Sequence, residues 1–216
     1  MSRKQSVLNI LSAFGILAAA FAYAYCLTFV PHLGFPSWQV IAVLNTVLAL
    51  FVLRIWRSRP IHRGGLSSEI LGWSAGFLIL LGSFLLIYIG AFFKKETHLH
   101  IYSMLEIIGL CLWVPVVEEI IFRRFVSEWI GRRAPGLWAV YLSALAFALA
   151  HTSPMSQPWP PLGPFLLGFG CTWVYRATGR LLAPILLHAA CNASAILFAI
   201  YAPTWLNHLN WLYQKL

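Results

Sequence analysis

Long apolar stretches, separated by short polar segments, dominate the chain. They cover roughly residues 7–30, 36–53, 69–93, 101–130, 137–151, 162–176 and 181–203. A helix of about 20 apolar residues spans the hydrocarbon core of a bilayer, and it satisfies its backbone polar groups internally. The pattern therefore predicts an all-α polytopic membrane protein. We expect a bundle of seven transmembrane helices, or eight if the tail at 204–214 enters the bilayer.

Composition supports a membrane protein and indicates an orientation. The chain is 60% hydrophobic and 10% charged, whereas soluble domains are about half apolar and a quarter charged. With the N-terminus inside, the 15 Lys and Arg residues split 12 to 3 in favour of the inner loops. The net charge of +9 therefore reflects topology. We expect a multi-pass integral membrane protein that contacts the lipid bilayer and no nucleic acid, in the cytoplasmic membrane if the source is prokaryotic.

The four cysteines, Cys26, Cys111, Cys171 and Cys191, each lie within an apolar stretch, and no two have the spacing of metal ligands. We expect buried free thiols that pack as small apolar side chains, with no disulfide framework.

The stretch VPVVEEIIFRRF at 114–125 places four charges in a segment that otherwise suits lipid. Glu119 and Arg123 are four residues apart, so on a helix they share a face and can neutralise each other. Glu118 points about 100° away and has no cation in register on its own helix. A carboxylate of this kind suits proton transfer, and ionisable groups within spans are functional candidates by default.

Helix geometry also relates Glu118 to His151. Arg132 and Arg133 mark a turn between two helices, and both Glu118 and His151 lie about 14 residues, or roughly 21 Å, from that turn. Antiparallel helices would therefore bring the two side chains to one level. They could then share a water molecule.

His188 and Asn192, in LLHAACN, are four residues apart and also share a face. Counted from Arg180, His188 lies roughly 12 Å into the bilayer, which is shallower than the level of Glu118 and His151. Each of these polar groups also has a structural interpretation, as an ion pair, a packed histidine or an interhelical hydrogen bond. For Glu106 we expect a structural or interfacial role. The structural interpretations lose weight because the groups gather in three neighbouring helices.

Three ordered motifs resemble those of the CPBP family of intramembrane glutamic proteases, which includes Rce1-type CAAX prenyl endopeptidases and bacteriocin-processing enzymes. They are EExxxR at 118–123, FxxxH at 147–151 and HxxxN at 188–192. The passage GFGCTWVYRATGRLLAPILLH between the last two is also similar to the family pattern. The resemblance covers about residues 101–200.

The resemblance implies a role for each matched residue. Glu118 and His151 would activate a water for peptide hydrolysis, and His188 and Asn192 would form the oxyanion site. Glu119 and Arg123 would support the site, and Phe147 is the first residue of the FxxxH motif. One departure is Arg124, which stands where many members have glycine. We expect its side chain to face the inner interface or to contact substrate.

The resemblance also divides the chain. Residues 1–100 are expected to form N-terminal transmembrane helices without a specific motif, 101–203 a CPBP-like protease core, and 204–216 a Trp-rich interfacial tail. The implied function is a membrane-embedded endopeptidase acting on a membrane-associated or lipid-anchored protein or peptide, with no cofactor. Zinc binding is the alternative for the site, although HExxH is absent. A proton-coupled transporter and a non-catalytic membrane scaffold are the alternatives for the whole protein.

Overall fold

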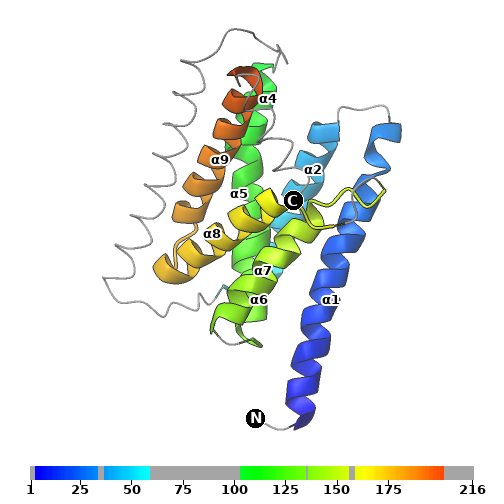
Figure 1. The fold of residues 1–216 in the computed structure, drawn as a ribbon, viewed down its shortest axis with the longest axis vertical. Coiled ribbons are helices and arrows are strands. Elements are labelled where there is room, and N and C mark those ends of the chain that lie inside the picture. The colour runs from blue at the N-terminus through cyan, green and yellow to red at the C-terminus, as the bar shows by residue number, and fades with distance from the viewer. Residues whose placement is uncertain (1–2, 34–36, 59–102, 135, 156–158, 202–216) are drawn as a thin grey trace.

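The structure is a computed structural model that describes residues 3–33, 37–58, 103–134, 136–155 and 159–201. Every regular element in these ranges is a helix, so the predicted all-α class is confirmed. Figure 1 shows the helices as a bundle, in which the long first helix lies at one side and the last helix at the other.

Two N-terminal helices have the length and composition of membrane spans. They are α1 (Arg3–Leu27) and α2 (Ser37–Ile55), joined through a short 3-10 turn at Val30–Leu33. Within them, Leu8–Leu27 and Trp38–Ile55 have mean hydropathies of 2.0 and 1.9. Their outer faces expose large apolar side chains, which is typical of helices that contact lipid.

The predicted number of spans stays a prediction. Among the described residues these two helices alone are long and apolar enough to cross a membrane, and the apolar helical stretches 136–150 and 182–196 are shorter. The expected span at 69–93 and the expected tail at 204–216 lie outside the described residues.

A continuous helical rod from Met104 to Gly131 carries the first motif. It consists of α4 (Met104–Ile108), a π-helical stretch at Gly109–Trp113, α5 (Val114–Glu119), a second π-helical stretch at Ile120–Ser127, and α6 (Glu128–Gly131). A capping box starts the rod, in which Ser103 and Glu106 bond each other's backbone N–H groups. Glu106 therefore has a structural role, in agreement with the sequence-based expectation.

Proline and glycine shape the other helix ends. Pro115 begins α5 and lacks a backbone N–H, and the wider π-helical turn before it accommodates its ring. Helix α8 (Leu162–Thr178) ends at Gly179, whose φ of 67° is left-handed and therefore favours glycine. Pro184 lies in the first turn of α9 (Leu182–Tyr201), as the sequence predicts.

Helix α7 (Gly136–Ala150) forms the centre of the bundle, and α1 and α8 pack against it. Its buried positions are mostly small, among them Ala139, Ser143 and Ala144 at 0% exposure. Across from them, a Cβ on Gly168 of α8 would lie 3.1 Å from Phe147 Cβ and 3.2 Å from the Ala144 backbone. Small residues thus allow α7 and α8 to approach closely, as is common between membrane helices.

Candidate active site

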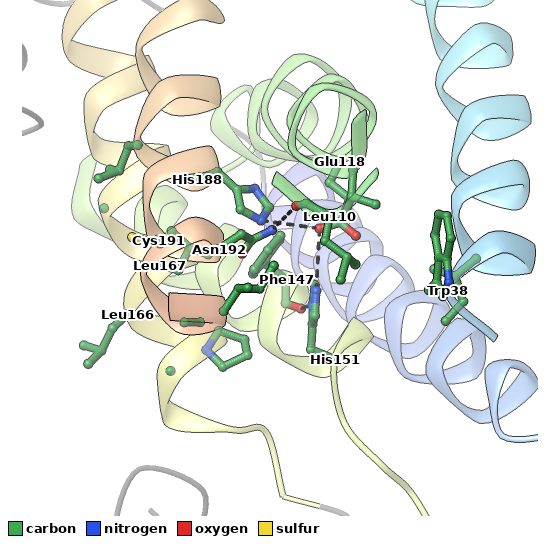
Figure 2. Close-up of a pocket in the computed structure, with 18 residues that line it drawn as sticks. Trp38, Leu110, Glu118, Phe147, His151, Leu166, Leu167, His188, Cys191 and Asn192 are labelled. Atoms are coloured by element: carbon green, nitrogen blue, oxygen red, sulfur yellow. Dashed lines mark hydrogen bonds and ion pairs between the residues drawn. The ribbon is translucent and has the colours of Figure 1, made fainter. Parts of the chain in front are cut away.

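The four residues predicted to carry the chemistry line a single cavity of about 700 Å³. Glu118 comes from α5, His151 directly follows α7, and His188 and Asn192 come from α9. Figure 2 shows Glu118, His151 and His188 pointing toward one another at the wall of this cavity. Most of the remaining lining is apolar and includes Leu110, Val114, Leu166, Leu167, Leu187 and Ile196.

Glu119 and Arg123 form the ion pair that their spacing predicts. Arg123 Nε donates to Glu119 Oε2 at 2.6 Å and Nη2 donates to Oε1 at 3.2 Å, with both side chains fully buried. The third guanidinium nitrogen, Nη1, donates to Thr172 Oγ1 at 2.8 Å. Because these bonds satisfy both charges, the pair ties the central rod to α8 without an unpaired buried charge.

Glu119 also reaches a third helix, which the sequence did not predict. Its Oε1 lies 2.9 Å from His188 Nδ1, and this oxygen can only accept while the carboxylate is paired with Arg123. We infer that Nδ1 of His188 carries the hydrogen. The other ring nitrogen, Nε2, then faces Glu118 Oε2 at 3.9 Å. Glu119 therefore orients His188 toward the cavity.

The FxxxH spacing has a local structural cause. Helix α7 ends at Ala150, and the backbone N–H of His151 bonds to Ala148 O instead of Phe147 O. The Phe147 carbonyl is thus an unpaired helix end, and His151 Nδ1 bonds it at 2.8 Å. A carbonyl oxygen only accepts, so Nδ1 carries the hydrogen and Nε2 points at Glu118.

The ring of Phe147 forms a platform under the polar groups. It packs against the His151 ring at 4.3 Å between centroids, and against the edge of His188 at 5.7 Å. The guanidinium of Arg123 lies 5.0 Å from the same ring centroid. The phenyl ring, 1% exposed, therefore fixes both histidines and keeps that side of the cluster dry.

Glu118 lies between the two histidines. Its Oε2 is buried without a hydrogen-bond partner among the described residues, 3.6 Å from His151 Nε2 and 3.9 Å from His188 Nε2. Both distances exceed a direct hydrogen bond, and they match a geometry in which a small polar molecule bridges the groups. The expectation that Glu118 and His151 share one level is consistent with this placement.

Simple counting aligns His188 with Glu118 only if a helix is tilted or starts further into the bilayer. Counting residues from Arg180 put it shallower than Glu118, yet the two side chains are 3.9 Å apart. Figure 1 shows the reason: α8 runs obliquely across the bundle, so α9 begins deeper than α7 does. Residue counting assumed that all turns lie at one level.

Asn192 lines the cavity, and one hydrogen of its amide is already used. Its Nδ2 donates to the Leu110 carbonyl at 2.8 Å. That carbonyl lies in the first π-helical stretch, where the register of backbone bonds changes. The second amide hydrogen of Asn192 remains available for a bound molecule.

Sequence reasoning missed two residues of the site, Tyr23 and Asn45. Asn45 Nδ2 donates to Glu118 Oε1 at 3.2 Å, and Tyr23 OH donates to Asn45 Oδ1 at 2.6 Å. The signal was present, because Asn45 and the adjacent Thr46 are the polar residues of the run VIAVLNTVLALFVL. It was not used because no motif marks the first hundred residues.

Other singled-out residues lie away from the chemistry. Arg124 does not line the cavity, and its Nε is buried without a hydrogen-bond partner among the described residues, which the structure does not explain. All four cysteines are free thiols, but Cys26 is exposed on α1, contrary to the expectation of burial, because that face of α1 is unpacked. Cys191 is partly buried at the cavity wall.

Metal ligation has little support in the geometry. In the part of the chain that the structure describes, no three His, Cys, Asp or Glu side chains are grouped to hold an ion. Glu119 is engaged by Arg123 and His188.

The fold and site together indicate a membrane protein with a buried acid–base cluster beside an apolar cavity, and comparison with known proteins supplies the family. Residues 100–205 match the family model described as type II CAAX prenyl endopeptidase Rce1-like. This segment, just under half of the chain, is therefore similar to the Rce1-like CAAX prenyl endopeptidases. The resemblance seen in the motifs is confirmed.

A curated relative covers more of the chain. CAAX prenyl protease 2 of Caenorhabditis elegans is 25% identical over 197 residues, covering 78% of this chain and 70% of the relative. No solved structure matches the chain.

Proposed function

We propose that this protein is a multi-pass membrane endopeptidase in which Glu118 and His151 activate a water molecule for peptide-bond hydrolysis. The observation that carries the proposal is the placement of Glu118 Oε2 between the Nε2 atoms of His151 and His188 at a cavity wall. The match of residues 100–205 to a family model of prenyl endopeptidases also supports it.

Proton positions follow from the hydrogen-bond partners. Neutral His151 has its hydrogen on Nδ1, so its Nε2 offers a lone pair to water beside Glu118. Glu118 accepts the proton from the attacking water, and His151 orients that water. The carboxylate then returns the proton to the leaving amine, so no covalent intermediate is needed.

The developing oxyanion needs hydrogen-bond donors in a place that excludes bulk water. Asn192 has one amide hydrogen left after its bond to Leu110 O. His188 is the second group assigned to the oxyanion position, because Glu119 fixes its ring and its Nε2 faces the region beside Glu118.

The cavity indicates the class of substrate. Its volume of about 700 Å³ lies in the range of pockets that take drug-sized ligands, about 300–1,000 Å³. Its walls are mostly apolar and its polar groups converge at one place, which suits a peptide bearing a lipid or apolar segment beside the scissile bond. We propose a membrane-associated, prenylated protein or peptide, consistent with the name of the matched family.

The test is hydrolysis of a prenylated CAAX peptide by purified protein in lipid nanodiscs, with the unprenylated peptide as comparison. We expect Glu118→Gln to lower kcat by about 10²–10⁴-fold, the usual contribution of a general base. The matched control is Glu106→Gln, because this acid lies on the same rod and glutamine also serves in a capping box. Wild-type turnover by folded Glu118→Gln would contradict the mechanism.

The cellular substrate is found by comparing the termini of membrane proteins in cells carrying wild type and Glu118→Gln. Accumulated uncleaved termini in the variant identify it. A phenotype that persists unchanged in Glu118→Gln would favour a scaffold instead.

A further inference from the structure

The two N-terminal helices contribute a hydrogen-bonded chain that ends on the glutamate of the site. Tyr23 of α1 donates its hydroxyl hydrogen to Asn45 Oδ1 at 2.6 Å, and Asn45 Nδ2 donates to Glu118 Oε1 at 3.2 Å. Three helices thus meet through three polar side chains. Both helices precede the segment that matches the family model, residues 100–205.

Burial fixes the donor and acceptor roles in the hydrogen bonds from Tyr23 to Asn45 to Glu118. Asn45 is 4% exposed and Glu118 5% exposed, so both groups depend on protein partners. An ionised carboxylate only accepts, so the amide must turn its NH₂ toward Glu118 and its oxygen toward Tyr23. Tyr23 OH must then be a donor. Each bond in the chain therefore fixes the orientation of the next group.

The chain also divides the two oxygens of Glu118 between two tasks. Oε1 is held by Asn45, while Oε2 faces the Nε2 atoms of both histidines. Without the bond to Oε1, the carboxylate could rotate about χ3, a torsion that has no sharp preferred value in glutamate. The amide of Asn45 thus selects the rotamer in which Oε2 points to the reacting region.

A second cavity is lined both by the hydrogen-bonded residues Tyr23 and Asn45 and by the proposed catalytic pair. It measures about 280 Å³ and is lined by Tyr23 and Asn45 as well as by Glu118 and His151. The larger cavity reaches the same Glu118–His151 pair. Tyr23 and Asn45 therefore line a second cavity that reaches the same pair.

We propose that Asn45 and Tyr23 are positioning residues for the water-activating carboxylate, with Asn45 acting on Glu118 and Tyr23 acting on Asn45. This inference rests on the proposed function. It assigns α1 and α2 a part in catalysis as well as in anchoring the chain.

The experiment measures kcat and KM on the prenylated peptide, per folded molecule, for Asn45→Leu, Tyr23→Phe and the double variant. We expect kcat to fall about 10- to 100-fold in Asn45→Leu, since a hydrogen bond to a charged group is lost. Tyr23→Phe should lose about three- to tenfold. KM should stay within about twofold, because neither residue is expected to hold the substrate.

Two readouts separate positioning from a structural role. The double variant should be no slower than Asn45→Leu alone, because Tyr23 acts only through Asn45. Tyr25→Phe is the matched control, since this exposed tyrosine lies two residues along the same helix and should keep the wild-type kcat. A structural role alone would lower thermal stability and yield while leaving kcat per folded molecule unchanged.

The outcomes distinguish this inference from the proposed function. If wild type is active, Glu118→Gln is inactive, and both Asn45→Leu and Tyr23→Phe keep the wild-type kcat, the positioning role alone is overturned. If Asn45→Leu does not fold, Tyr23→Phe decides, since it removes a single hydroxyl. If Glu118→Gln is as active as wild type, the proposed function falls and the positioning role falls with it.

Discussion

At the scale of single residues, the site depends on side chains that hold each other's orientation. His151 is fixed by the Phe147 carbonyl and His188 by Glu119, so each histidine presents Nε2 to the same carboxylate oxygen. Glu119 and Arg123 keep a charge balance in a region that excludes water. Of the two adjacent glutamates, one is thus committed to holding the cluster together, and the other is left for chemistry.

These commitments lead to a prediction about metals. Glu119 is engaged by Arg123 and His188, and among the described residues no three His, Cys, Asp or Glu side chains are grouped to hold an ion. We expect cleavage of the prenylated peptide to continue at the wild-type rate in EDTA and in 1,10-phenanthroline. Activity that is lost in both chelators and restored by added zinc would show that the site is a metal centre.

At the scale of elements, the central rod and α8 place the site. The rod contains two π-helical stretches, and the EExxxR motif crosses the start of the second one, at Ile120. π-helical turns are frequent at functional sites because they shift the facing of the residues around them. Here the i,i+4 pair of Glu119 and Arg123 survives the change, which is why spacing alone predicted it.

The contact of α7 with α8 depends on Gly168. Its absent Cβ would lie 3.2 Å from the Ala144 backbone, which cannot move as a side chain can. We expect Gly168→Ala to destabilise the protein by about 1–3 kcal/mol, as overpacked cores do. The measurement is thermal unfolding in a mild detergent.

Gly170→Ala is the matched control on the same helix. Its Cβ would meet only Leu187 Cδ2, at 3.6 Å, an ordinary contact. Alanine is also the better helix former by about 1 kcal/mol. The control should therefore be neutral or stabilising, and an equal loss in both variants would show that close packing at Gly168 is not the cause.

At the scale of the whole molecule, a third buried carboxylate joins distant elements near the C-terminal end of the rod. Glu128 accepts hydrogen bonds from Trp56 Nε1, from the Ser58 hydroxyl and from Tyr175 OH. These donors come from the segment after α2 and from α8. Tyr175 belongs to the family-like passage before HxxxN, so one residue of that passage serves assembly.

Because these bonds lie away from the cavity, we expect removing one of them to lower stability and to leave kcat unchanged. Tyr175→Phe removes a bond of 2.6 Å to a carboxylate, which should cost about 1.5–3 kcal/mol. Tyr141→Phe is the control, because Tyr141 is 45% exposed and should change stability by less than about 0.5 kcal/mol. Both are measured by thermal unfolding, and kcat per folded molecule should stay at the wild-type value. If Tyr175→Phe were as stable as Tyr141→Phe, the bond from Tyr175 to Glu128 would not hold these elements together.

The sequence by itself determined the helices and the pairing of polar residues along single helices. Apolar stretches predicted α1, α2, the central rod, α7, α8 and α9 to within a few residues, because in lipid an apolar segment satisfies its backbone only as a helix. Spacing along single helices predicted the pair of Glu119 and Arg123. These features are local, so a linear pattern records them.

Tertiary structure alone decided the contacts between helices. The oblique path of α8 brings His188 to the level of Glu118, and the packing of α1 and α2 brings Tyr23 and Asn45 to the same glutamate. Neither follows from periodicity, because the tilt and depth of a helix are set by the neighbours it packs against. The charged stretch at 114–125 indicated a site, and residues from helices distant in sequence contribute the remaining side chains.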